Sequence, residues 1–292
     1  MKRAALVLVA AAALPVAAAA QTPVDQTRPA AADATVSIEN LAGSTKVTGW
    51  DRLEVRVKGT VCSGCELNLD GNDKRVRVEV ESSHLNAMAA KSDIEVSVPA
   101  GSLVKVEGFN ATISIAGVNG PVRAETVNGS ITHAGGSKDV QLQSVNGAVE
   151  SSRAAGRVHV EAVNGPVTVR DASGELEAST VNGKLVVSGG SFTRAHLEAV
   201  GGGIRFESAV APKGSLGVET VSGPVDLFFP AGADADFTVT TFSGSVTNEL
   251  GPAAQKKDEF SPEKELVFTT GKGGTRVSVE TLSGAISIHK KP

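Results

Sequence analysis

The chain is poor in the side chains on which many binding sites depend. Among its 292 residues there is no tyrosine, Trp50 is the single tryptophan, and the aromatic fraction is 3%. Aromatic rings supply stacking surface for sugars and much of the energy of protein interfaces, so we expect neither a sugar-stacking platform nor an aromatic hot spot. The formal net charge is −4. This acidic balance disfavours nucleic acid as a partner, because phosphate contacts need clustered basic residues.

Sequence motifs of catalysis and metal binding are also missing. The five histidines are scattered along the chain, and neither His-Glu-x-x-His nor Gly-x-Ser-x-Gly occurs. The acidic residues lack the Asp-x-Asp/Asn-x-Asp spacing of a calcium loop. We therefore predict a protein that is not an enzyme and has no cofactor and no metal site.

The first twenty residues have the pattern of a cleavable signal peptide. Lys2 and Arg3 precede an apolar stretch at 4–16 that is too short to span a bilayer, and three alanines at 18–20 form a small-residue cleavage site. No later stretch has the length and hydropathy of a membrane helix. We expect an exported protein, in the periplasm or at the cell surface, whose residues 21–34 form a flexible linker.

From residue 35 onward the pattern is that of β-strands. Apolar and polar residues alternate at 36–38, 53–57, 76–80 and 94–98, and Asp-Gly-Asn-Asp at 70–73 marks a hairpin turn. Only residues 83–92 could form a helix, and it would be short. We assign residues 35–107 to an N-terminal β-rich capping region.

A short phrase of the type Val-Asn-Gly-x-Val recurs through the rest of the chain. Its glycine steps by 18 residues from Gly129 to Gly147, Gly165 and Gly183, and then by 19, 21, 21 and 40. An 18-residue period accommodates two strands and two corners, so the spacing predicts an all-β solenoid of stacked coils over residues 108–292, with an insertion at about 248–275. The first valine of the phrase, as in Val163, Val181 and Val221, is assigned to the core. Because side chains fill the space between the facing strands, function is expected on the outer faces, the corners or the ends.

The corner itself has two structural interpretations. The stacked amides could form a hydrogen-bonded ladder, as identical polar side chains do in cross-β stacks. Alternatively, Asn-Gly serves a tight turn because both residues tolerate positive φ. The predicted corner residues are Asn128, Gly129, Asn146, Gly147, Asn164, Gly165, Asn182 and Gly183.

The repeated phrase resembles the bacterial β-strand-repeat family labelled "putative adhesin", a domain-of-unknown-function family. The Thr-Gly-Trp-Asp-Arg element at 48–52 fits this family, as does Val-Pro-Ala-Gly at 98–101, which returns as Phe-Pro-Ala-Gly at 229–232. The resemblance covers about residues 35–290. It implies an exported β-solenoid and brings no catalytic residues with it.

The two cysteines, Cys62 and Cys65, depart from that family pattern. In an exported protein a Cys-x-x-Cys pair is typical of a local disulfide that closes a turn. The alternative is a redox-active pair, which requires a helix N-terminus to lower a thiol pKa, whereas the flanking sequence has the pattern of strands. We predict a structural disulfide.

The outer faces offer one candidate binding surface. Glutamates recur four residues before the glycine, and Glu161, Glu198 and Glu219 are its main candidates. They form either a face for a cation or basic ligand, or a solubilising surface. The insertion at 248–275 is either a binding loop or a self-packed excursion.

We therefore predict an adhesin-like binding or scaffolding protein of the cell envelope, whose partner is an envelope or extracellular protein or glycan. One alternative is a periplasmic protein that responds to thiol and disulfide exchange through Cys62 and Cys65. A less favoured alternative is a carbohydrate-active β-helix enzyme with Glu198 and Glu219 as its carboxylate pair.

Overall fold

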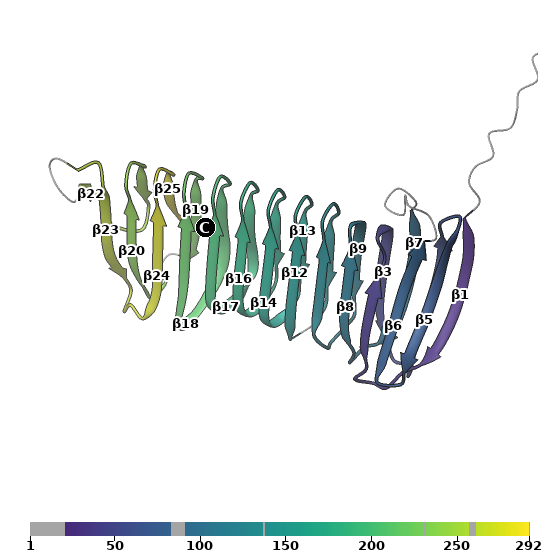
Figure 1. Cartoon of the computed structure of the whole chain (residues 1–292). Coiled ribbons are helices and arrows are strands. Elements are labelled where there is room, and N and C mark those ends of the chain that lie inside the picture. Colours follow the sequence, from purple (N-terminus) through teal and green to yellow (C-terminus); the bar gives the residue numbers. More distant parts are fainter. Residues whose placement is uncertain (1–20, 83–90, 137, 231, 257–260, 292) are drawn as a thin grey trace, which may run out of the picture.

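The described part of the chain is built from β-strands stacked into one elongated body (Figure 1). The structure, a computed structural model, describes residues 21–82, 91–136, 138–230, 232–256 and 261–291. Within these ranges there is no helix, and successive coils lie side by side along the long axis. The prediction of an all-β, solenoid-like fold is confirmed.

The central coils each contribute one strand to each of two sheets. Equivalent strands of neighbouring coils pair in parallel, as where Val140 pairs with Val158 and Val158 with Leu176. The register is continuous up to β16 and shifts locally where β17 pairs with β16 and β18. The two longest strands, β17 and β18, each bend at a corner and belong to one sheet in their first half and to the other sheet in their second half. The central strands are β8 (Leu103–Gly108), β9 (Asn110–Ala116), β10 (Val122–Thr126), β11 (Ile131–Ala134), β12 (Asp139–Ser144), β13 (Val149–Ser152), β14 (Ala155–Ala162), β15 (Val167–Arg170), β16 (Ser173–Thr180), β17 (Leu185–Ala199), β18 (Ile204–Thr220) and β19 (Val225–Pro230).

The core consists of the alternate side chains that both sheets direct inward. Val158, Val160 and Leu185 are fully buried, and the C-terminal coils add the buried rings of Phe192 and Phe206. Each such side chain contributes roughly 1.5–3 kcal/mol when it leaves water. Because each coil is only two strands thick, this burial depends on the coils above and below it.

One buried column contains polar side chains. His133 and Ser151 occupy adjacent coils, and their partners in the same column are Ile115, Val169 and Val187. The His133 Nδ1 and Ser151 Oγ atoms lie 3.2 Å apart in a hydrogen bond. Burial lowers the pKa of His133 to about 4, so its neutral form is the one compatible with the core.

The N-terminal coils do not stack in chain order. β2 pairs in parallel with both β6 and β8, and β3 pairs in parallel with both β7 and β9, so the first coil lies between two later ones. Antiparallel strands complete this end, with β5 beside β6 and β4 between β7 and β1. These strands are β1 (Thr22–Pro29), β2 (Thr35–Glu39), β3 (Ala42–Trp50), β4 (Glu54–Val61), β5 (Cys65–Asn72), β6 (Arg75–Ser82) and β7 (Ser92–Pro99).

The prediction that residues 21–34 form a flexible linker is wrong. Residues 22–29 form β1, which pairs with β4 along its whole length, and Ala30 and Ala34 are buried. The two prolines of β1 are tolerated because an edge strand needs hydrogen bonds on one side only, and β1 covers the otherwise open edge of β4. The short helix considered for residues 83–92 falls largely on 83–90, outside the described residues, and Ser92 begins β7.

The C-terminal end shows the same kind of exchange. β24 lies between β18 and β20, and β25 lies between β19 and β21, so the last coil separates two coils that precede it in the chain (Figure 1). The described part of the 248–275 insertion is no free loop, because β23 pairs antiparallel with β20 and buries Leu266. The strands are β20 (Ala235–Thr241), β21 (Val246–Asn248), β22 (Gln255–Lys256), β23 (Lys264–Thr270), β24 (Thr275–Thr281) and β25 (Ile286–Lys291).

Candidate functional site

One corner of the stack exposes a line of large apolar side chains. The first residue of the repeated phrase points outward, because the residue before it, such as Thr180 or Thr220, is the one that points inward. The core assignment of Val181 and Val221 is therefore wrong, and Val163 is only half-buried. We call the exposed residues of this corner the apolar ridge, which in stack order consists of Val145, Val181, Val200, Val221, Leu282 and Phe242.

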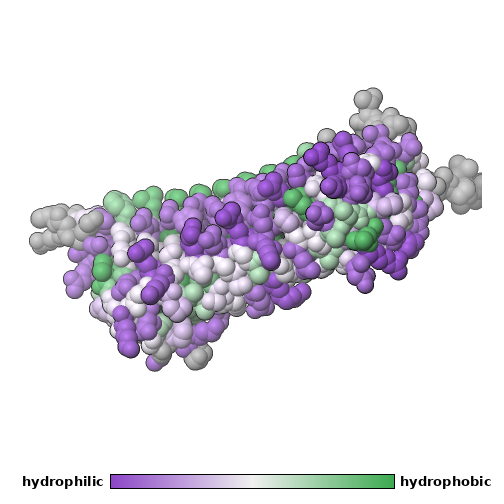
Figure 2. Space-filling model, turned by 90° about the horizontal axis from the view of Figure 1, so that it is seen from below, coloured by the Kyte–Doolittle hydropathy of each residue, from purple (hydrophilic) through white to green (hydrophobic). Residues whose placement is uncertain are grey.

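The exposure of the apolar ridge is substantial. Val145, Val181, Val200 and Val221 are 38–47% exposed, and Phe242 and Leu282 are 51% and 55% exposed. In Figure 2, hydrophobic residues form a line along one long margin of the molecule. Contiguous exposed apolar surface of this kind marks interaction sites in soluble proteins.

Close stacking explains the glycine that follows the ridge residue. A Cβ atom on Gly147, Gly165 or Gly183 would lie 1.9–2.0 Å from the carbonyl oxygen of the equivalent glycine in the preceding coil, and on Gly129 it would lie 2.0 Å from the Ala111 carbonyl oxygen. None of these four glycines, nor any of the asparagines before them, has positive φ. The turn interpretation based on positive φ is therefore wrong, and the glycines are needed for the close approach of two backbones.

The asparagines beside the ridge form a hydrogen-bonded ladder. Each side-chain Nδ2 donates to the Oδ1 of the previous coil at 2.8–2.9 Å, from Asn182 through Asn164, Asn146 and Asn128 to Asn110. The ladder ends at Gly201, which has no side chain to continue it. The sequence Val-Asn-Gly-Pro-Val at 118–122 has the same pattern but belongs to the opposite corner, where Val118 is buried and the backbone N–H of Asn119 donates to the Ala100 carbonyl oxygen. The ladder fixes the spacing of the coils from Asn110 to Asn182, which carry Val145 and Val181 of the apolar ridge.

A row of glutamates runs parallel to the apolar ridge, and each glutamate lies two residues before the ridge position of its own coil. In chain order the coil that follows Glu219 carries Thr240 at this position, but β18 pairs with β24, so Glu280 is the residue next to Glu219. Glu198, Glu219 and Glu280 are thus direct neighbours in three successive coils, about 4.8 Å apart. We call Glu161, Glu198, Glu219 and Glu280 the acidic row; Ser179 separates the first from the others.

The acidic row has few polar partners. Glu198 Oε1 lies 2.6 Å from His196 Nε2, and Glu161 accepts a hydrogen bond from Gln143 Nε2 at 3.3 Å and lies 3.9 Å from His159 Nε2. Within the described ranges, Glu219 and Glu280 take part in no ion pair. Like charges on directly opposed residues of neighbouring strands repel, so the row concentrates negative charge at this face.

The acidic row and the apolar ridge form the two walls of an open groove. Its floor is the backbone at residues whose side chains point inward, including Thr180, Ala199 and Thr220, and its volume is about 700 Å³. Thr240 and Glu263 also line it. A second hollow of about 310 Å³, lined by Glu125 and Val145 among others, continues the same surface toward the N-terminal end.

The described residues contain few other features that could form a functional site. They contain no group of three or more His, Cys, Asp or Glu side chains placed to hold a metal ion. They also contain no helix long and apolar enough to cross a membrane.

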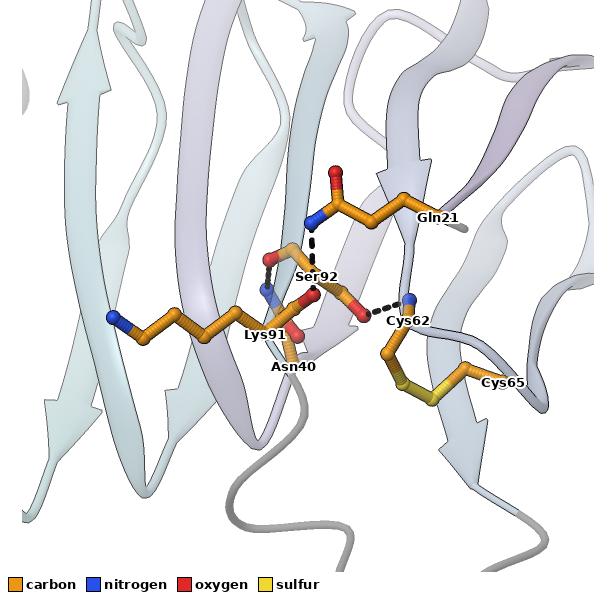
Figure 3. The surroundings of a disulfide bond; sticks show 6 residues. All are labelled: Gln21, Asn40, Cys62, Cys65, Lys91 and Ser92. Atoms are coloured by element: carbon orange, nitrogen blue, oxygen red, sulfur yellow. Dashed lines mark hydrogen bonds between the residues drawn. A yellow bond between two sulfur atoms is a disulfide. The ribbon is translucent and has the colours of Figure 1, made fainter. Parts of the chain in front are cut away.

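Cys62 and Cys65 lie at the N-terminal end of the stack and form a disulfide there (Figure 3). Their Cα atoms are 5.1 Å apart, and the bond closes the turn between β4 and β5. The Cys62 amide donates to Ser92 Oγ at 3.0 Å, and Asn40 Nδ2 donates to the Ser92 carbonyl oxygen at 3.0 Å. The disulfide thus belongs to a hydrogen-bonded junction between β4, β7 and the end of β2.

Sequence reasoning placed Glu280 among the recurring glutamates, but it missed the apolar ridge, the adjacency of Glu280 to Glu219, and the place of Phe242 in the groove. The signal for the ridge was present: strict alternation from Val158 through Val160 to Ala162 requires the next residue to face outward. The sequence contains no such signal for the pairing of Glu280 with Glu219, because that pairing arises from the insertion of the last coil between two earlier ones.

Comparison with known proteins identifies the family of this fold. The description Toastrack DUF4097 matches residues 30–289, and no curated protein matches the chain. A crystal structure of "a putative adhesin" from Parabacteroides merdae is similar at 10% identity, over 92% of this chain and 97% of that one, with a TM-score of 0.51.

Two further solved structures are similar at 11% identity. One is a "putative lipid binding protein" from Parabacteroides distasonis, covering 92% of this chain and 97% of that one, with a TM-score of 0.48. The other is "a putative adhesin" from Bacteroides fragilis, covering 93% of this chain and 99% of that one, with a TM-score of 0.40. The expected resemblance to the adhesin-labelled β-repeat family is confirmed, and the chain belongs to the Toastrack DUF4097 family.

Proposed function

We propose that this chain is an exported, non-enzymatic binding protein of the cell envelope, and that the groove between the acidic row and the apolar ridge is its contact surface. The observation that carries the proposal is the apolar ridge. Six large apolar side chains stand exposed in one line, although an ordinary solvated corner would favour polar residues there.

The architecture supports a binding role because it holds this surface rigidly. Parallel strand pairing fixes the spacing of successive ridge residues, so little conformational freedom is lost when a partner binds. The "putative adhesin" names of similar solved structures agree with a surface-contact role.

The groove has few features that favour catalysis. Glu198 and Glu219 lie side by side, as two carboxylates of a glycosidase could, but the side chains of the facing wall are apolar and offer no hydrogen bonds to position a sugar. The Cys62–Cys65 disulfide is packed into a structural junction at the N-terminal end, which supports a stabilising role.

The proposal can be tested by following where the protein goes and what keeps it there. Cell fractionation should place the mature protein in the envelope fraction, and purified protein should adsorb to isolated envelopes. The triple variant Val200→Ser/Val221→Ser/Leu282→Ser should lower adsorption about tenfold, because about 1.4 kcal/mol of lost contact corresponds to that factor.

The control removes two apolar side chains elsewhere that are more exposed than those of the ridge variant. Leu53 and Val267 are 63% and 65% exposed and lie outside the ridge, so Leu53→Ser/Val267→Ser should adsorb as the parent does. Equal adsorption by the ridge variant and the parent would refute the groove as the contact surface. Recovery of the protein in the cytoplasmic fraction alone would refute the envelope assignment.

A further inference from the structure

We propose that the groove binds a cationic amphipathic α-helix, a segment with lysine or arginine along one side and apolar residues along the adjacent side. This inference rests on the proposed function, because it names the class of partner that the contact surface accepts. It is carried by three properties of the groove: its charge, its two unlike walls and its repeat distance.

The charge of the groove selects a cationic partner. Glu198, Glu219 and Glu280 follow one another without an intervening neutral residue. The last two have no ion pair within the described part of the chain, and Glu263 adds a fourth carboxylate to the lining at the C-terminal end. Lysine or arginine side chains placed along this row would relieve the mutual repulsion of the carboxylates, which gives complementarity of charge.

The second wall requires that the partner be apolar as well. A ridge residue follows its glutamate by two positions, as Val221 follows Glu219, so the two walls are separated by about 6.6 Å along the strand. An α-helix with its side chains is about 10–12 Å in diameter. One helix can therefore contact both walls at once, with a basic stripe against the acidic row and an apolar stripe against the ridge.

The repeat distance of the coils favours a helix over an extended peptide. Coils rise about 4.8 Å each, whereas side chains on one face of an extended strand repeat about every 6.6–6.8 Å and lose register within two coils. Helix positions three and four apart are displaced by about 4.5 and 6.0 Å along the axis, which brackets the coil spacing. The five ridge residues from Val181 to Phe242 in stack order span four coil steps, or about 19 Å, which corresponds to about 13 helical residues.

Other occupants fit less well. An anionic membrane surface would meet the same carboxylates that attract a basic helix, and repulsion would oppose the contact. A small cation would neutralise the row but leave the ridge exposed. A second copy of this chain docked groove to groove would bring two acidic rows together.

A designed peptide provides the direct test. The probe is a fluorescein-labelled 16-residue helix of leucine and lysine with an amphipathic repeat, titrated by fluorescence anisotropy at 50 and 150 mM NaCl. We expect saturable one-to-one binding, and at least about tenfold weaker binding to Glu198→Gln/Glu219→Gln/Glu280→Gln and to the ridge triple variant of the preceding subsection. A scrambled peptide of the same composition should bind at least about tenfold more weakly to the parent protein.

The charge control must remove the same net charge at the far end of the stack. Glu66, Asp70 and Glu81 are exposed residues of β5 and β6, so Glu66→Gln/Asp70→Asn/Glu81→Gln should bind the probe as the parent does. Equal losses in the two charge variants, or equal binding of the scrambled peptide, would show unspecific attraction and overturn the inference. So would ridge-dependent binding of anionic lipid vesicles without binding of the probe.

The failure of this inference is distinguishable from failure of the proposed function. Ridge-dependent adsorption to envelopes without binding of the probe would remove the helix as partner and leave the groove as a contact surface. If neither adsorption to envelopes nor binding of the probe depended on the ridge, both the inference and the proposed function would be refuted. All altered side chains are exposed, and circular dichroism with thermal unfolding verifies that each variant keeps the parent fold.

Discussion

Glu219 and Glu280 are direct partners in adjacent parallel strands, although they lie in different coils far apart in the chain. The pairing arises because the last coil, β24 and β25, inserts between β18–β19 and β20–β21. It produces three consecutive glutamates where the order of the chain would have produced two. This local concentration of charge is a cost to stability that a binding role would explain.

Removal of one of these charges should stabilise the protein. Glu219→Gln relieves repulsion with Glu198 and with Glu280, and each such pair is worth about 0.2–1 kcal/mol. The free energy of unfolding, measured with urea at 20 mM NaCl, should rise, and the gain should shrink at 500 mM NaCl because salt screens exposed charges. Asp33→Asn, in the exposed turn between β1 and β2 and outside any strand pair, should leave the free energy of unfolding unchanged. A destabilising Glu219→Gln would contradict the account.

The buried His133 should make stability depend on pH in a defined window. Burial lowers its folded-state pKa to about 4, below the value of about 6.5 expected in the unfolded chain. Between these values the unfolded state binds more protons, so the stability present above pH 6.5 is lost as pH falls toward 4. The loss reaches about 3 kcal/mol at pH 4, because one pKa unit corresponds to about 1.4 kcal/mol.

The double variant His133→Val/Ser151→Val isolates this contribution. Valine already occupies the same column at Val169 and Val187, so the pair should pack without a buried polar group. Urea unfolding at pH 7.5, 6, 5 and 4.5 should show a flatter pH dependence in the variant than in the parent. Parallel pH profiles would mean that His133 does not titrate as the structure requires.

Close approach between coils makes the corner glycines intolerant of a side chain. A Cβ atom on Gly165 would lie 2.0 Å from the Gly147 carbonyl oxygen. The backbone of the neighbouring coil cannot move aside without breaking its strand pairing. We expect Gly165→Ala to cost about 3–5 kcal/mol or to prevent folding. Gly136→Ala is the control, because its Cβ would meet only Asn119 Oδ1 at 3.7 Å. Thermal unfolding of both variants decides the matter, and an unaffected Gly165→Ala would contradict the stacking geometry.

The disulfide should stabilise the fold without taking part in binding. For a loop as short as Cys62 to Cys65, loop-closure entropy predicts a loss of about 2 kcal/mol in Cys62→Ser/Cys65→Ser. The peptide probe should bind this variant as it binds the parent. A change in binding on reduction of the parent protein would revive the thiol-responsive alternative.

Different parts of this structure were predictable to different degrees. The spacing from Gly129 to Gly183 determined the coil length, because a two-strand coil with close-packed corners repeats its glycine at a constant interval. The outward direction of Val181 also followed from alternation, although the repeated phrase itself drew attention to its apolar character. The order of coils at the ends did not follow, since coils with the same pattern present equivalent edges. By its sequence pattern alone, β18 could pair with β20 as well as with β24.

Residues 21–34 illustrate another limit of sequence reasoning. Their composition is that of a linker, with two prolines, yet β1 forms because β4 offers an open edge. Tertiary context of this kind is invisible to local composition.

The most direct test of the groove as a contact surface is a fluorescence reporter placed inside it. Phe242 lies on the apolar ridge, 51% exposed, and Trp50 is the single tryptophan, so Phe242→Trp in a Trp50→Phe background carries one indole in the groove. Addition of the amphipathic basic helix should shift the emission of this indole to shorter wavelength and protect it from acrylamide quenching. The midpoint of the change should fall at the same peptide concentration as in the anisotropy titration. An unchanged spectrum at saturating peptide would place the bound helix elsewhere and contradict the account.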